Sequence, residues 1–322
     1  MELQVLIARA ALAASATALL AGCSKEITVD LPETEPRVVV EASIETGQPP
    51  IVFLTRTQSF FAPTSVASIA STYISDARVW VNGDSLTRIC SSLIPDSLID
   101  EVAASTGIDA NLLRAANICA WTSLDGTIEG VEGQTYDLRV ETEGKVITSS
   151  TTIPNGLSLD STWFRLANQQ PGDDSLGFIW ARLSDPDTAG NAYRWYAQRI
   201  NSGADGEAKD ASFIAPFFSA FEDRYFNGRS FEFAFNRGQE PYSTAEDDIN
   251  GERGYFKRGD TVVVKFCSIG LNEYRFFDSF YSNASSQGDV FSNPANIVSN
   301  IDGGLGVWVG YAPRLDTLVC AP

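Results

Sequence analysis

Residues 136–152 read YDLRVETEGKVITSSTT, and this stretch determines the class of fold. Two runs, Tyr136–Glu141 and Lys145–Thr152, flank the dipeptide Glu143-Gly144. Both runs carry the β-branched and alternating side chains that favour strands, and the dipeptide supplies a glycine to a turn that needs positive φ. The stretch therefore predicts a β-hairpin.

The same pattern continues towards the start of the chain. Ala77–Val81 alternates and leads into Asn82-Gly83, which is a strong signal for a second hairpin. Arg37–Ile44 and Ile51–Ser59 read as two further strands. Short strands with turns at this spacing are typical of a β-sandwich of Ig-like or transthyretin-like type.

The second half of the chain is also rich in strand signals. Ile153-Pro154-Asn155-Gly156 interrupts the pattern and marks the predicted domain boundary. Asn272–Ser282 has the spacing of a helix with one aromatic face. We therefore expect an all-β protein with two β-sandwich-like domains, residues 37–155 and 156–322. The strands predicted in the second domain are Phe178–Leu183, Tyr193–Ile200, Phe231–Phe235, Thr261–Ser268 and Gly306–Tyr311.

A small helical insertion, residues 91–118, departs from the β pattern of the first domain. Apolar residues recur at helical spacing within Pro95–Asn117, and Cys90 and Cys119 bracket the segment. A disulfide there would clamp the base of the insertion. The insertion is either a partner-binding element or a cover for an exposed sheet edge.

The start of the chain has the pattern of a targeting signal. A mostly apolar run from Ala11 to Ala21 is too short to span a bilayer, and it ends in small residues before Cys23. We expect a signal peptide at residues 1–22, cleavage after Gly22, acylation of Cys23, and a tether at 23–36. The alternative is an ordinary secretory signal followed by a chance cysteine.

Four cysteines remain once Cys23 is assigned to the lipid, and an even number suits an oxidising compartment. They allow three pairings. We favour Cys90–Cys119 and Cys267–Cys320, because each pair then stays inside one predicted domain, and each bridge would contribute about 3–4 kcal/mol. A metal site is the disfavoured alternative, since the chain has no C-x-x-C spacing and no histidine.

Composition excludes several classes of function. The net charge of −18 disfavours nucleic acid and anionic headgroups, and it favours cationic partners, metal ions or plain solubility. The absence of histidine removes Ser-His-Asp triads, Cys-His pairs and the H-E-x-x-H zinc helix. We therefore predict that the protein is not an enzyme. Carboxylate-only chemistry such as glycoside hydrolysis is the class that this argument leaves open.

Two acidic loops resemble oxygen-ligand loops. Asp185, Asp187 and Asn191 have the residue types that calcium prefers, so this loop is a candidate calcium site, and no other cofactor is expected. The alternative is a capped turn between strands. The second loop, Glu246–Gly251, reads as either a ligand loop or a solvated run of charge.

Aromatic residues are dense between Phe213 and Phe256. On exposed loops they would stack on sugar rings or grip a peptide, and in a core they would carry no function. Gly303-Gly304-Leu305-Gly306 opens no predicted helix, so it does not predict a phosphate site.

A group of stretches over nearly all of the chain after Cys23 forms a recognisable pattern. They are Val38–Glu41, Tyr136–Val140, Thr151–Pro154, Asp185-Pro186, Asn191–Arg194, Phe226–Gly228, Gly259–Val262 and Asn293–Gly306. Together these stretches resemble domain-of-unknown-function family 4249. The resemblance implies an outer-membrane lipoprotein of Bacteroidota-like bacteria, often encoded near a TonB-dependent receptor, with no established activity and no catalytic residues. The helical insertion is not part of the family's core pattern.

Three hypotheses follow. The first is a non-enzymatic accessory or ligand-capture subunit of a TonB-dependent transporter, anchored to the outer membrane through lipid at Cys23. The second is a free-standing structural or adhesive surface protein that uses the aromatic region. The third is a carboxylate-dependent hydrolase, which needs two acids about 5–9.5 Å apart in a cleft. The sequence does not decide which face of the membrane the body occupies.

Overall fold

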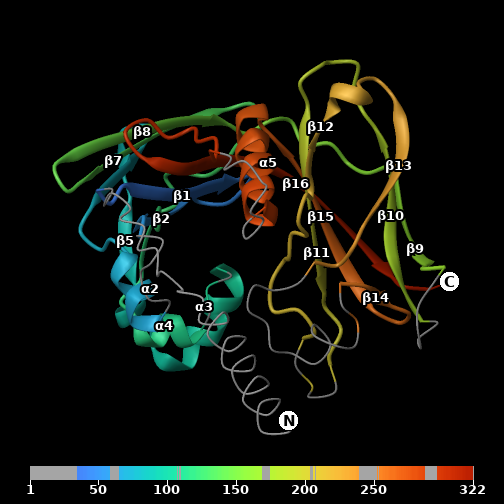
Figure 1. Cartoon of the computed structure of the whole chain (residues 1–322), viewed down its shortest axis with the longest axis horizontal. Coiled ribbons are helices and arrows are strands. Elements are labelled where there is room, and N and C mark those ends of the chain that lie inside the picture. Colours follow the sequence, from blue (N-terminus) through green and yellow to red (C-terminus); the bar gives the residue numbers. More distant parts are fainter. Residues whose placement is uncertain are drawn as a thin grey trace, which may run out of the picture. The chain divides into compact units, whose positions relative to one another are not determined.

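A computed structural model describes residues 35–58, 65–106, 108, 110–168, 175–203, 206, 208–238, 252, 254–286 and 296–321 (Figure 1). The chain divides into two compact units, residues 1–35 and 36–322, and the first lies outside the described residues except for Glu35. The described part is rich in strands and has few helices, so the predicted all-β, sandwich-like class is confirmed.

A long central sheet organises the second unit. Its strands are hydrogen-bonded in the order β12-β11-β15-β16-β1-β2-β6-β5. Strands β1 and β16 pair in parallel, with Val39 opposite Leu305, and the other neighbours in this sheet pair antiparallel. The bounds are β1 Val38–Glu45, β2 Ile51–Arg56, β5 Thr87–Cys90, β6 Cys119–Thr122, β11 Ala192–Arg199, β12 Ala220–Glu222, β15 Thr261–Ile269 and β16 Leu305–Val319.

A first small sheet has the order β4-β3-β7-β8 and contains both predicted hairpins. Asn82 and Gly83 adopt φ of 53° and 90°, and Glu143 and Gly144 adopt 53° and 72°, as the two-residue turns require. The bounds are β3 Arg78–Val81, β4 Asp84–Ser85, β7 Thr135–Thr142 and β8 Lys145–Thr152. Both hairpin predictions are therefore confirmed.

A second small sheet has the order β13-β10-β14, with β9 also paired to β10. The aromatic stretch of β13 alternates, and its phenylalanines pack against a core that contains Trp195 and Phe266. The bounds are β9 Ser161–Leu166, β10 Leu176–Ser184, β13 Ser230–Phe235 and β14 Phe256–Lys257.

Both small sheets cover the same face of the central sheet. Trp308 of β16 belongs to the core under the first small sheet, whereas Phe266 of β15 belongs to the core under the second. Ala312 is directly opposite Ser268, so even-numbered β16 residues share a face with Phe266. The two sandwiches predicted on either side of residue 155 thus share one sheet, and residues 36–322 form a single compact unit.

Helices cover the other face of the central sheet. Helix α5 (Leu271–Ser286) packs on Val307, Val309 and Tyr311 of β16. Helices α3 (Ile99–Thr106) and α4 (Ala110–Ala115) form their own small core, against which Phe53 of β2 packs. Two single 3-10 turns, η1 (Ser91–Leu93) and η2 (Asp96–Leu98), precede α3, and η3 (Asp223–Tyr225) follows β12.

A short helix, α2 (Val66–Thr72), was not predicted from the sequence. Ser65 caps it by accepting a hydrogen bond from the backbone N–H of Ser68, and the Ser68 hydroxyl receives one from Ser65 in return. Seven residues are too few for a clear helical period, which explains why periodicity alone did not find it.

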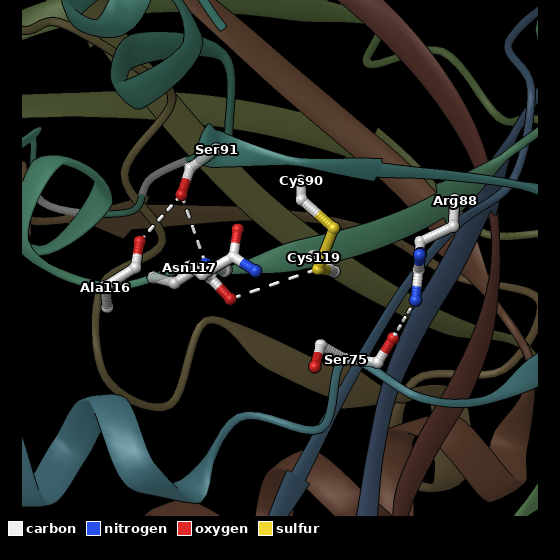
Figure 2. Close-up of a disulfide and its surroundings, with 8 residues drawn as sticks. Ser75, Arg88, Cys90, Ser91, Ala116, Asn117 and Cys119 are labelled. Atoms are coloured by element: carbon white, nitrogen blue, oxygen red, sulfur yellow. Dashed lines mark hydrogen bonds between the residues drawn. A yellow bond between two sulfur atoms is a disulfide. The ribbon is translucent and has the colours of Figure 1, made fainter. Parts of the chain in front are cut away.

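The predicted helical insertion and its disulfide are both present. Cys90 and Cys119 face each other across β5 and β6 and are bonded, as Figure 2 shows. The buried Ser91 hydroxyl donates to the carbonyl of Ala116 at 2.7 Å and accepts from the N–H of Ile118 at 3.1 Å. Disulfide and serine together fix both ends of the insertion at the end of the central sheet.

The second predicted disulfide is wrong. Cys267 and Cys320 are both free, buried thiols, and burial raises the pKa of each to about 12. Cys267 lies opposite Pro313 in the β15–β16 pair. Cys320 lies at the other end of this strand pair, where its N–H donates to the carbonyl of Asp260. At about 3.3 Å per residue the two cysteines are roughly 20 Å apart, far beyond the reach of a disulfide.

The glycine stretch Gly303–Gly306 serves close packing. An added Cβ on Gly306 would lie 2.0 Å from the carbonyl oxygen of Val40, and its φ is +106°. One on Gly303, at φ +81°, would lie 2.9 Å from the carbonyl oxygen of Val146. These glycines therefore let the chain enter β16 directly against β1 and β8.

Candidate functional site

Helix α5 is fixed to the sheet at its N-terminal end by a buried carboxylate. Glu273 is 4% exposed and accepts hydrogen bonds from the Thr151 hydroxyl at 2.7 Å and the Asn300 side-chain amide at 3.3 Å. Asn300 also binds both backbone groups of Trp308, and Thr151 accepts from the N–H of Gly310. Helix, β8 and β16 are thus joined by one buried polar group.

Replacing this carboxylate is expected to change the pH dependence of stability. Burial raises the pKa of Glu273, although its hydrogen bonds with Thr151 and Asn300 act to lower it. The folded state therefore holds this proton more tightly than the unfolded state, and the group's stabilisation is lost as pH rises above about 4.5. Glu273→Gln should gain stability relative to the parent protein as pH rises from about 4 to 7. Urea unfolding across this range measures the difference, and a difference that is constant with pH would contradict the assignment.

An arginine–tyrosine cluster lies beneath the middle of α5. Arg194 donates to the Tyr311 hydroxyl at 2.7 Å and to the Tyr281 hydroxyl at 3.0 Å, and its guanidinium lies 3.6 Å from the centre of the Phe277 ring. Tyr196 donates to Tyr311 at 3.1 Å, and burial raises the pKa of Tyr196 well above its ordinary value. Neutral hydroxyls and an aromatic face hold this guanidinium, which gives α5 a rigid base.

Three exposed phenylalanines surround Tyr281 on the outer side of this cluster. Phe217, Phe218 and Phe280 are 65%, 48% and 42% exposed. Their ring centroids lie 5.3, 5.8 and 5.7 Å from that of Tyr281. We call these four residues the α5 aromatic patch. Exposing large aromatic side chains to water costs free energy, so an exposed cluster of this kind is typical of a contact surface.

The backbone at Phe218 is strained. Its φ is +59°, in the left-handed region that bulky side chains rarely occupy. Such strain costs about 1–3 kcal/mol and is concentrated at functional positions. The unusual conformation places two consecutive phenylalanines against the same tyrosine.

A separate open cleft of about 930 Å³ lies on the outer face of the first small sheet. Trp80 and Arg139 are directly opposite each other on its floor, and Asn300 and Asp302 contribute from the chain that precedes β16. Backbone hydrogen bonds in both directions between Thr148 and Asp302 hold that chain against β8. We call this site the Trp80 cleft.

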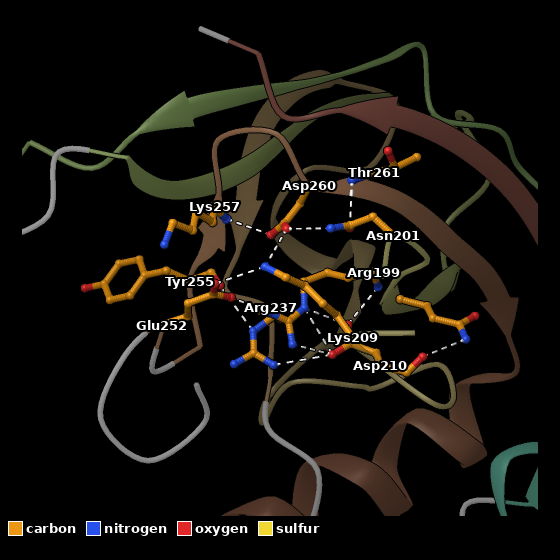
Figure 3. Close-up of polar contacts among 11 residues, drawn as sticks. Arg199, Asn201, Lys209, Asp210, Arg237, Glu252, Tyr255, Lys257, Asp260 and Thr261 are labelled. Atoms are coloured by element: carbon orange, nitrogen blue, oxygen red, sulfur yellow. Dashed lines mark hydrogen bonds and ion pairs between the residues drawn. The ribbon is translucent and has the colours of Figure 1, made fainter. Parts of the chain in front are cut away.

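A buried ion network lies where β11 ends at Arg199 and where Asp260 directly precedes β15 (Figure 3). Arg199 donates to Asp210 at 2.6 Å and contacts Glu252, and Lys209 donates to Glu252 at 3.0 Å and to Asp260 at 2.9 Å. We call these five residues the Arg199 network. Three carboxylates meet two cations here, and Arg237 lies 3.5 Å from Asp210, so the charges balance. This balance is typical of a structural role that joins loops to strand ends.

The predicted calcium residues Asp185 and Asn191 make hydrogen bonds within the protein. The Asp185 carboxylate accepts from the Tyr193 hydroxyl at 2.6 Å and from the N–H of Gly228 at 3.1 Å. Asp187 is exposed, and Asn191 donates through its side chain to the carbonyl of Thr188. Among the described residues no cluster of three or more His, Cys, Asp or Glu side chains is placed to hold a metal. The loop has the contacts of a capped turn.

The remaining predicted site residues are partly buried, partly exposed and partly outside the described residues. Of the aromatic region, Phe256 is fully buried and Phe221 packs on the second core, whereas Phe217 and Phe218 are exposed. Gly22, Cys23, Tyr242 and the loop 246–251 lie outside the described residues. Sequence analysis missed Trp80, although the alternation of buried Val79 and Val81 around it indicates an outward side chain.

Comparison with known proteins identifies a family. A family model described as a domain of unknown function, DUF4249, matches residues 24–314. No curated protein matches the chain. Within the described ranges, no helix combines the length and apolar character needed to cross a membrane.

Proposed function

Since the chain belongs to the DUF4249 family, to which no function is assigned, we propose that it is a non-enzymatic accessory subunit of a TonB-dependent transporter. It is anchored to the outer membrane by lipid at Cys23, captures ligand, and docks to the transporter through the α5 aromatic patch. The observation that carries this proposal is the strained Phe218 backbone beside Phe217 on an exposed surface.

The architecture of the patch supports docking. Exposed aromatic side chains on a rigid base lose little conformational entropy on binding, and such residues dominate the affinity of protein interfaces. The Arg194 cluster supplies that base, because Tyr281 is held by Arg194 from below and contacts all three phenylalanines from above. A non-enzymatic role also fits a chain without histidine.

A pull-down from native membranes tests the proposal. The tagged full-length protein is solubilised in mild detergent, and the parent is compared with the double variant Phe217→Ser, Phe218→Ser. We expect the parent to retain a stoichiometric barrel receptor and the variant to retain at least tenfold less, because an aromatic anchor contributes about 2 kcal/mol or more.

Leu124→Ser is the matched control, since Leu124 is 65% exposed and lies outside the patch. It should retain the receptor as the parent does. If the folded, lipidated parent brings down no barrel, the accessory role is wrong. The exposed aromatics would then favour the second candidate, a free-standing adhesive surface protein.

A further inference from the structure

The Trp80 cleft presents one aromatic ring in a fixed orientation. Trp80 is half-buried, and Arg78 lies with its guanidinium 5.6 Å from the ring centre. Arg78 is itself paired with Glu141 at 2.5 Å, and Glu141 also pairs with Arg139 at 2.6 Å. The indole is therefore held by the sheet, and the arginine charges beside it are already paired.

Uncommitted polar groups line the rest of the cleft. The carboxylates of Asp137 and Asp302 and the hydroxyls of Thr148 and Ser150 line the cleft, and all four residues are exposed. None of these side chains forms a hydrogen bond or ion pair with another described residue. Asn82 binds the N–H of Asp137 through its side-chain oxygen at 2.8 Å, which leaves its amide NH₂ as a donor.

The position of these groups is rigid. Asp137 and Ser150 are directly opposite each other on β7 and β8, and Arg139 and Thr148 form the next such pair. Ser149 donates to the carbonyl of Asn300 at 2.7 Å, which adds a contact between the sheet and the wall of the cleft. Because Asp137, Thr148 and Ser150 lie on paired strands, the site is largely formed before any ligand arrives.

The charges of the cleft disfavour an anionic ligand. The carboxylates of Asp137 and Asp302 would repel it, and Arg78 and Arg139 are already paired with Glu141. A neutral ligand with many hydroxyl groups avoids this repulsion, and its rings can stack on the indole as a linear polyamine cannot. Its hydroxyls would donate to carboxylates and accept from the amide, and its C–H faces would stack on the ring.

From this combination we infer that the Trp80 cleft binds a neutral oligosaccharide. The inference rests on the ligand-capture part of the proposed function and names its cargo class. A volume of about 930 Å³ is within the range of small-molecule sites and admits more than one sugar ring. The site is open, so a segment of a longer chain can enter it.

Calorimetric titration of the full-length protein, purified in a detergent without a sugar headgroup, tests the inference. The probes are maltopentaose, cellopentaose, mannopentaose and xylopentaose, with an oligogalacturonate as the acidic arm and spermidine as the cationic arm. We expect at least one neutral oligosaccharide to bind, and to bind more tightly than either charged probe. Trp80→Ala should weaken binding at least tenfold, and Asp137→Asn should weaken it severalfold without disturbing the sheet.

Trp163→Ala is the matched control, because Trp163 is a half-buried tryptophan on the outer face of the other small sheet. It should bind as the parent does. The inference is overturned if no neutral oligosaccharide binds, if a charged probe binds as tightly, or if Trp80→Ala and Asp137→Asn leave affinity unchanged. Trp80→Ala should still bring down the barrel receptor, so failure of the cargo and failure of the docking are distinguishable.

Discussion

Arg199→Met is expected to lower the free energy of unfolding by about 3–5 kcal/mol, because it removes one of the cations that the buried carboxylates of Asp210 and Glu252 share. Arg199, Asp210 and Glu252 have side chains that are 2%, 2% and 5% exposed. The guanidinium donates to Asp210, and the N–H of Arg199 donates to the same carboxylate at 2.7 Å. Burial alone would lower the pKa of Arg199, but its hydrogen bonds and charge interaction with Asp210 raise it, so the group stays charged.

The loss should be large because the remaining cations compensate only in part for the missing positive charge. Lys209 is divided between Glu252 and Asp260, and Arg237 is 3.5 Å from Asp210. Arg182→Met is the matched control, since its pair with Glu232 spans 3.6 Å with both side chains about half exposed, and it should cost about 1 kcal/mol or less. Urea unfolding measures both. Equal losses in the two variants would show that the network does not stabilise the fold.

Gly306→Ala is expected to destabilise by about 3–5 kcal/mol, and to reduce the yield of folded protein, since strain and overpacking add at one position. The new Cβ would lie 2.0 Å from the backbone carbonyl oxygen of Val40. The clash is with backbone, which cannot move aside as the end of a flexible side chain can. The position lies in the parallel pairing of β16 with β1, where Gly306 is opposite Val40. Denaturant unfolding and near-ultraviolet circular dichroism measure the change.

Gly259→Ala separates the two causes of this loss. Gly259 has φ of +94°, close to that of Gly306, but no heavy atom of the described structure lies within 4 Å of its added Cβ. It should therefore cost only the backbone strain, about 1–3 kcal/mol. If both variants lose the same amount, the close approach of β16 to β1 contributes nothing.

Local signals predicted the parts of the fold that are made locally. The Asn82-Gly83 turn and the Cys90–Cys119 clamp were readable because the residues that form each feature are close in sequence or bracket a single segment. The pairing of β1 with β16 could not be predicted from the sequence, because the periodicity within a strand does not indicate which distant strand it pairs with. The Cys267–Cys320 prediction failed for the same reason, since register along β15 and β16 decides the distance.

The candidate sites divide in the same way. The aromatic region that contains Phe217 and Phe218 was flagged by composition, but its separation into buried and exposed members depends on tertiary packing. The Trp80 cleft needs Asp302 beside Thr148, a contact between distant segments. Alternation alone indicates that Trp80 points outward, and it gives no sign of the wall facing it.

The parallel pairing of the first strand with the last has a consequence for the order of events during synthesis. Strand β1 is made first, yet one of its two neighbours, β16, is made last. Contacts of such sequence separation are slow to form, and the central sheet stays incomplete until the whole chain is available. During that interval one edge of β1 is an open template for wrong pairing. Truncation shortly before residue 305 should therefore convert a folding protein into an aggregating one.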